Sequence, residues 1–124
     1  MYDLTAVQTI LNSLVNNESF RLVVLLDLDG KTLAKAQMIE LLTESTQHIT
    51  PLLTQMHNAA AEVFATLTLE KLVTMIHLHT PQYNGFIKPI LQIYTLFVIT
   101  NASIEPSSVH SLLSQVEQQL NRIL

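Results

Sequence analysis

Apolar residues recur every three to four positions in three stretches of the chain, which is the spacing that lines one face of an α-helix. The first stretch covers residues 4–15, the second 49–67 and the third 106–124. In the second stretch, Thr50 followed by Pro51 is typical of an N-cap and a first helical position. The pattern therefore predicts three amphipathic helices, the second of them starting at this Thr-Pro pair.

Between these stretches the pattern fits β-strands. Residues 20–27 are almost all apolar and do not alternate, which indicates a strand buried on both faces. Residues 31–36 form a more polar strand directly after it. Three further strands are predicted at 72–80, 86–91 and 93–100, because these runs are rich in β-branched and aromatic residues.

The second half of the chain carries turn and edge signals. The segment 81–85, PQYNG, reads as a turn because of its Pro, Asn and Gly. Pro89 lacks a backbone N–H, so we expect it at a sheet edge or a bulge. The segment 37–48 is ambiguous, and its residues 38–42, MIELL, could form a separate short helix. Within 72–80 we expect Val73, Met75, His77 and His79 on one face and Leu72, Thr74, Ile76 and Leu78 on the other.

This order of elements predicts an α/β fold. We expect three helices and a five-stranded, mostly antiparallel sheet in the order α-β-β-α-β-β-β-α. Strands that are apolar on both sides need cover on both faces, so the sheet should be the middle layer of an α/β/α sandwich. The length of 124 residues suits one domain, 1–124.

The charge content narrows the classes of function. Charged residues make up 13% of the chain and apolar residues 48%, and this charged share is about half the usual one. Soluble monomers rarely expose large apolar patches, so we expect a partner to cover part of the surface. The net charge of −4 without a basic stripe argues against nucleic acid. No apolar run is long enough to insert into a membrane, and a cytoplasmic protein is the default expectation.

The strongest candidate for chemistry is DLDG, in which Asp27 and Asp29 follow an apolar strand. Haloacid dehalogenase phosphatases place a magnesium-binding Asp-x-Asp-Gly-Thr motif there. Here Lys31 stands in place of the Thr, and no Asp occurs later in the chain. An EF-hand would need a glutamate six residues after Gly30, where Ala36 stands. We therefore interpret the segment as a hairpin turn, and the magnesium phosphatase stays a minor alternative.

The histidines are the second candidate. His77 and His79 lie two apart on one strand face, a spacing that could place two imidazoles beside a metal ion. The sequence offers them no obvious third ligand, and His48 and His57 are nine residues apart, which does not match helical i, i+4 spacing. Only two glycines occur, so a phosphate-binding loop is not expected. We predict no catalytic residues, no metal and no cofactor.

The order of elements and two local patterns resemble the roadblock family of dynein light chains and GTPase regulators over nearly the whole chain. One pattern is LVVLLDLDGKTLA at 22–34, where the family has an apolar strand, an Asp/Asn-x-[Asp/Glu]-Gly turn and a short strand. The other is LVTMIHLHTPQYNGFIKPILQIYTLFVITN at 72–101. There the family has a strand starting at Leu, a loop, a strand ending near Pro, and an apolar strand closing on Asn.

The resemblance implies a non-enzymatic protein that forms dimers, in which two sheets join across a twofold axis with the central helices nearby. The residues then expected in the interface are Met56, Ala59, Ala60, Val63, Val73, Met75 and His77. Members bind small Ras-like GTPases, act as scaffolds of larger complexes, or bind a motor intermediate chain as dynein light chains. A terminal helix such as 106–124 occurs in the GTPase-associated and scaffold branches, which favours those partners.

Overall fold

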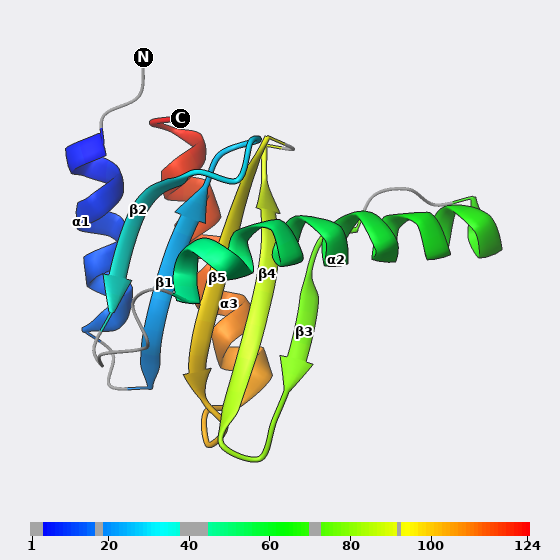
Figure 1. Cartoon of the computed structure of the whole chain (residues 1–124). Coiled ribbons are helices and arrows are strands. Elements are labelled where there is room, and N and C mark those ends of the chain that lie inside the picture. The colour runs from blue at the N-terminus through cyan, green and yellow to red at the C-terminus, as the bar shows by residue number, and fades with distance from the viewer. Residues whose placement is uncertain (1–3, 17–18, 38–44, 70–72, 92) are drawn as a thin grey trace.

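The computed structural model describes residues 4–16, 19–37, 45–69, 73–91 and 93–124. It contains three helices and five strands in the predicted order (Figure 1). These elements are α1 (Leu4–Val15), β1 (Phe20–Leu26), β2 (Thr32–Gln37), α2 (Ser45–Thr68), β3 (Ile76–His79), β4 (Tyr83–Ile90), β5 (Tyr94–Asn101) and α3 (Pro106–Asn121).

The strands form one antiparallel sheet in the order β2-β1-β5-β4-β3. Figure 1 shows α1 and α3 on one side of this sheet and α2 on the other. The α/β/α sandwich with a five-stranded antiparallel sheet is therefore confirmed. β2 and β3 lie at the two edges, and β5 is in the centre between β1 and β4.

The larger core lies between the sheet and the helices α1 and α3. Helix α1 contributes Val7 and Leu11, one turn apart, and α3 contributes Leu113 and Leu120. They pack with Phe86 and other residues of the sheet, and all five are fully buried. Burying a side chain of this size stabilises the fold by about 1.5–3 kcal/mol. Helices α1 and α3 therefore cover the central part of this face of the sheet.

The smaller core lies on the α2 face. Its buried residues are Leu22, Val24, Leu26, Leu53, Ile87 and Phe97. Val23 and Leu25 of β1 belong instead to the larger core, so β1 is buried on both faces, as its unbroken apolar run predicted. Among the α2 side chains that the structure describes, residues 51–68, only Leu53 is buried. Helix α2 therefore covers its face of the sheet incompletely.

The predicted start of the second helix is wrong. Helix α2 begins at Ser45, and Pro51 lies inside it, so Thr50 is not an N-cap. Proline removes the hydrogen bond to the carbonyl four residues earlier and its ring crowds that carbonyl. The helix nevertheless continues through Pro51 to Thr68. A Thr-Pro pair can therefore occur both at the start of a helix and a few residues inside one, and the pair alone does not distinguish the two positions. Residues 38–42, where a separate short helix was considered, lie outside the described residues.

The strands that follow α2 in the sequence also differ from their predicted boundaries. β3 is restricted to Ile76–His79, because residues 73–75 are not in strand conformation. β4 starts at Tyr83, so the turn is shorter than the predicted 81–85. The N–H of Thr80 donates to the carbonyl of Tyr83 at 2.8 Å, and the Tyr83 N–H donates to the Thr80 hydroxyl at 2.9 Å. These two bonds close a loop of only two residues.

Pro89 occupies the kind of position that its missing N–H requires. β4 is an inner strand, but β3 reaches only as far as Ile87 on one of its sides. Pro89 pairs with Thr95 of β5 on the other side. The missing donor therefore faces a stretch of β4 that no strand covers, which agrees with the expected edge position.

Candidate protein-interaction site

The segment from Asp27 to Lys31 is a hairpin turn. The N–H of Asp27 donates to the carbonyl of Lys31 at 2.9 Å, and the N–H of Gly30 donates to the Asp27 carbonyl at 3.0 Å. Gly30 has a φ of 84°, in the left-handed region. This pattern is a three-residue loop closed by a glycine bulge, one of the common hairpin connections. The turn interpretation of this segment is confirmed.

The two aspartates have different environments. One carboxylate oxygen of Asp27 accepts hydrogen bonds from the backbone N–H groups of Asp29 and Lys31, both at 2.9 Å. The Asp29 side chain is exposed. Asp27 therefore acts as a turn residue whose carboxylate is directed into its own loop. Across the described ranges, no three His, Cys, Asp or Glu side chains are grouped so that they could hold a metal ion.

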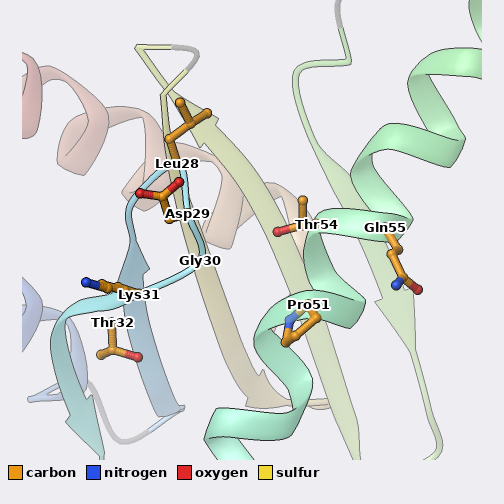
Figure 2. Close-up of a pocket in the computed structure, with 8 residues that line it drawn as sticks. All are labelled: Leu28, Asp29, Gly30, Lys31, Thr32, Pro51, Thr54 and Gln55. Atoms are coloured by element: carbon orange, nitrogen blue, oxygen red, sulfur yellow. The ribbon is translucent and has the colours of Figure 1, made fainter.

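A shallow pocket of about 720 Å³ lies between this hairpin and the first half of α2. Figure 2 shows residues 28–32 of the hairpin on one side of it and Pro51, Thr54 and Gln55 of α2 on the other. Among the described residues that line it, Asp29 supplies the one carboxylate and Lys31 the one ammonium group. These residues include no pair of acids for phosphoryl transfer.

A more enclosed pocket of about 180 Å³ lies next to it, between α2, the β1–β2 turn and the β4–β5 turn. His57 and Thr54 of α2 line it, together with Asp27 and Val73. The Nε2 atom of His57 is buried and has no hydrogen-bond partner among the described residues. A water molecule of suitable geometry would satisfy such an atom.

The second half of α2 is left uncovered by the other described elements of the chain. Figure 1 shows α2 continuing past β3, the last strand of the sheet. Val63, Phe64 and Leu67 lie on this overhanging half and are 53%, 51% and 76% exposed. Large apolar side chains at helical spacing normally face a core. Here that stripe faces solvent.

The sheet itself has an uncovered apolar hollow on the α2 face. It measures about 290 Å³ and is lined by Leu78, Thr80, Tyr83, Asn84, Gly85, Phe97 and Ile99. Gly85 contributes to its depth, because a Cβ atom there would lie 3.7 Å from both Leu78 Cβ and Phe97 Cε1. The hollow lies near the β3–β4 turn, whereas Ile76 at the start of β3 packs against the smaller core, to which α2 contributes Leu53.

β3 is the free edge beside this hollow. It pairs with β4 from Ile76 to His79 and is the last strand in the sheet order. An unpaired edge is a template for another strand. The overhanging helix, the hollow and the free edge together form what we call the α2/β3 surface, defined by Val63, Phe64, Leu67, Leu78, Tyr83, Ile99 and the backbone of Ile76–His79.

The residues expected in a dimer interface divide into groups. Met56, Ala59, Ala60 and Val63 all lie on α2; Ala59 and Val63 are exposed, whereas Met56 and Ala60 are partly buried. The other three expected residues, Val73, Met75 and His77, do not lie together.

Val73, Met75 and His77 do not share one face, because the chain is not in strand conformation before Ile76. Val73 lines the His57 pocket beside α2. Met75 packs against the core formed with α1 and α3, and His77 stacks on Phe86 of that same core at 4.5 Å between ring centroids. Met75 and His77 are thus on the opposite face of the sheet from α2.

The sequence interpretation missed Leu78, Tyr83 and Ile99. The signal was present in the alternation of Ile76 and Leu78, which lie on the α2 face with Ile87 and Ile99. Each face of that segment carries apolar residues, so the sequence did not show which of them meets α2.

No helix in the described part of the chain is long and apolar enough to cross a membrane.

Several solved structures have this fold. MglB of Myxococcus xanthus superimposes with a TM-score of 0.80 at 18% identity, over 98% of this chain and 91% of MglB. A Roadblock/LC7 domain from Streptomyces avermitilis gives a TM-score of 0.81 at 12% identity, over 93% of this chain and 94% of that domain. A structure described as MglB with tetrameric arrangement gives 0.72 at 16% identity, over 95% and 86% of the two chains.

The sequence matches no protein-family model, and no curated protein matches it. The structural likeness covers nearly the whole chain, and at these identities it establishes the fold. The expected similarity to roadblock proteins is therefore confirmed at the level of the fold. Because one fold hosts many functions, the function has to be argued from the α2/β3 surface.

Proposed function

We propose that this chain, as one roadblock-like domain of residues 1–124, is a non-enzymatic dimeric regulator or scaffold. In this proposal two copies associate through the α2/β3 surface, and the dimer binds a small Ras-like GTPase or a larger protein complex in the cytoplasm. The observation that carries the proposal is the overhanging half of α2, with Phe64 about half exposed, beside a free strand edge.

The proposed twofold axis is perpendicular to the sheet and lies beside the middle of β3, between the two paired β3 edges. The two β3 edges pair antiparallel and continue the sheet, which removes both free edges. The overhanging half of the partner's α2 then lies over this chain's sheet. Because α2 crosses near the start of β3, the rotation moves the partner's helix to the other end of the strand (Figure 1). The hollow lies at that end.

The contact would be isologous, since each copy supplies the same helix and hollow. Val63, Phe64 and Leu67 would cover Leu78, Tyr83 and Ile99 of the other copy, so apolar surface meets apolar surface. The MglB structure with tetrameric arrangement is similar in fold and self-associates, which supports association for this chain.

The GTPase part of the proposal rests on the roadblock resemblance and on the likeness to MglB. We expect neither arginine to enter a partner's nucleotide site. The Arg21 Nε–H donates to the side-chain oxygen of Asn101 at 2.9 Å, and Arg122 lies at the C-terminal cap of α3. If the chain accelerates GTP hydrolysis, it acts by positioning the GTPase's own groups.

Sedimentation equilibrium at micromolar concentration tests the dimer. We expect about twice the chain mass of 13.9 kDa for the unchanged protein. Phe64→Glu and Leu78→Glu should each give a folded monomer, because each buries an unpaired charge only in the dimer. Gln115→Glu, on the exposed side of α3, is the matched control and should stay dimeric.

A 13.9 kDa monomer for the unchanged chain would disprove the dimer. A dimer that survives both Phe64→Glu and Leu78→Glu would show that another surface forms the contact. Circular dichroism of each variant separates loss of the dimer from loss of the fold.

The GTPase partner has its own test. The immobilised dimer is exposed to the cytoplasmic fraction of its source cells, loaded either with GDP or with a non-hydrolysable GTP analogue. We expect a small GTPase to bind in one nucleotide state more than in the other. Capture of a motor intermediate chain instead would favour the dynein-type alternative.

Turnover of a generic phosphate ester with Mg²⁺ that is lost in Asp27→Asn would establish the phosphatase alternative.

A further inference from the structure

Two imidazole nitrogens and one amide oxygen converge at the edge of the sheet, on the face opposite α2. His77 Nε2 lies 3.1 Å from the side-chain oxygen of Asn84, and His79 Nδ1 lies 2.7 Å from the same oxygen. The two histidines belong to β3 and Asn84 to β4, directly across from His79. The proposed regulator function makes no use of this cluster.

Burial of Asn84 in the sheet and stacking of His77 on Phe86 hold the cluster in place. Asn84 is only 1% exposed, and the ring of His77 stacks on Phe86 with 4.5 Å between centroids and 7° between planes. Both histidines are exposed to solvent. The amide oxygen is therefore fixed in the sheet, while the two imidazoles form a solvent-accessible rim above it.

The distances place the three donors close enough to share one ion. For metal–ligand bonds of about 2.1 Å, two neighbouring donors lie about 3.0 Å apart at 90° and about 3.4 Å apart at the tetrahedral angle. The nitrogen–oxygen distances of 2.7 and 3.1 Å are those of the hydrogen bonds that join these groups without a metal. Shifts of a few tenths of an ångström would bring both imidazole nitrogens and the amide oxygen to the spacing of neighbouring ligands.

We propose that His77, His79 and Asn84 form a binding site for a divalent transition-metal ion that prefers octahedral or tetragonal geometry, Cu²⁺ or Ni²⁺ in chemical class. Imidazole is a good ligand for both ions, and sites of nitrogen and oxygen donors bind Cu²⁺ more tightly than Ni²⁺ or Zn²⁺. Water completes the coordination shell on the exposed side.

Binding replaces the two hydrogen bonds to Asn84 by coordination. Each neutral imidazole moves its proton to its other ring nitrogen, so that the lone pairs of His77 Nε2 and His79 Nδ1 face the ion. No net proton is released from neutral rings. The ion then lies between the two nitrogens and the Asn84 oxygen, which turns from hydrogen-bond acceptor into metal ligand.

All three donors belong to one chain, so the site does not depend on the dimer. It also lies on the opposite face of the sheet from α2. The monomeric variant Phe64→Glu should therefore bind the ion as the unchanged protein does. Failure of metal binding and failure of the dimer proposal are separate results.

Titration calorimetry of the untagged full-length chain with Cu²⁺ alone and with Ni²⁺ alone tests the site. We expect saturation at one ion per chain, with tighter binding of Cu²⁺. His77→Gln and His79→Gln should each weaken binding at least about tenfold, the lower end of what losing even a supporting group of a metal site costs. Asn84→Asp, which keeps the oxygen donor and adds charge, should strengthen it.

The matched control is His110→Gln. This exposed imidazole on α3 contacts the same Phe86 ring, at 5.8 Å between centroids, but is not part of the cluster. It should leave the affinity unchanged. Electron paramagnetic resonance of the Cu²⁺ complex should show two coordinated nitrogens, and one in each single variant. Absence of binding, or affinity unaffected by His77→Gln and His79→Gln, would overturn the proposal, as would an equal loss in His110→Gln.

Discussion

Asp27 and Lys31 close the β1–β2 loop through two hydrogen bonds of equal length. The Asp27 N–H donates to the Lys31 carbonyl, and the Lys31 N–H donates to the Asp27 carboxylate, each at 2.9 Å. We expect Asp27→Ala to lower the free energy of unfolding by about 1–2 kcal/mol, because it removes a charged acceptor of two backbone groups. Urea unfolding measures this change.

Two companion variants check that explanation. Asp27→Asn keeps a side-chain oxygen and should lose less than Asp27→Ala. Asp29→Asn should be nearly neutral, since that side chain is exposed and asparagine suits a turn equally well. An Asp29→Asn variant that is less stable than Asp27→Ala would contradict the roles assigned to the two aspartates.

Gly30 is the second determinant of the same loop. Its φ of 84° is costly for a β-branched residue. We expect Gly30→Val to destabilise the fold by about 1 kcal/mol or more. Gly30→Asn should lose clearly less, because asparagine tolerates this backbone region. Equal losses in the two variants, measured by thermal unfolding, would mean that the backbone angle is not the cause.

Lys88 is buried on the face of the sheet that packs against α3. Its ammonium group lies 3.6 Å from the carboxylate of Glu117, whose side chain is 34% exposed. We expect Glu117→Gln to destabilise the fold, by less than the ~3–5 kcal/mol typical of a fully buried pair, because water screens this one. Lys88→Met should be neutral or stabilising, since it removes the charge and keeps the volume.

Chemical denaturation of Glu117→Gln, Lys88→Met and the double variant forms a complete cycle. The loss in Glu117→Gln should disappear in the background of Lys88→Met. A loss that persists there would show that Glu117 acts through other contacts.

Met75 and Ala60 were both expected at the dimer contact, but the structure gives them different roles. Met75 packs against the core formed with α1 and α3, so Met75→Glu should destabilise the single chain by several kcal/mol. Ala60 is on α2 and only partly buried, so Ala60→Glu should weaken the dimer while the monomer keeps its fold. Thermal unfolding and sedimentation of the two variants separate these effects. A folded monomer from Met75→Glu would contradict this assignment.

Most of the fold was accessible from local patterns. The helical stripe of α1 appears in the structure as Val7, Leu11, Leu14 and Val15, all buried. The unbroken apolar run of β1 reports that both faces of that strand are covered. The turn at Asp27 to Lys31 was predictable because its chemistry lies within five consecutive residues.

Other features needed contacts between distant segments. The Thr50-Pro51 pair looks the same at a helix start and inside α2, and only the packing of the long helix distinguishes the two. The alternation around β3 gave two apolar faces. The tertiary structure decided that Ile76 and Leu78 lie on the α2 side of the sheet and that Met75 and His77 lie on the other side. The convergence of His77 and His79 on Asn84 required the register of β3 and β4.

The sequence by itself determined the order of helices and strands, the hairpin at Asp27 to Lys31 and the need for cover on both faces of β1, because each follows from periodicity or from neighbouring residues. Only the tertiary structure decided which apolar groups stay exposed. Helix α2 continues past β3 (Figure 1), and Phe64 and Leu67, near its C-terminal end, are exposed. The hollow at Leu78 and Ile99 stays open because it lies near the β3–β4 turn, away from the start of β3 where α2 crosses. Exposure of this kind depends on where elements end in space, and a local pattern does not contain that information.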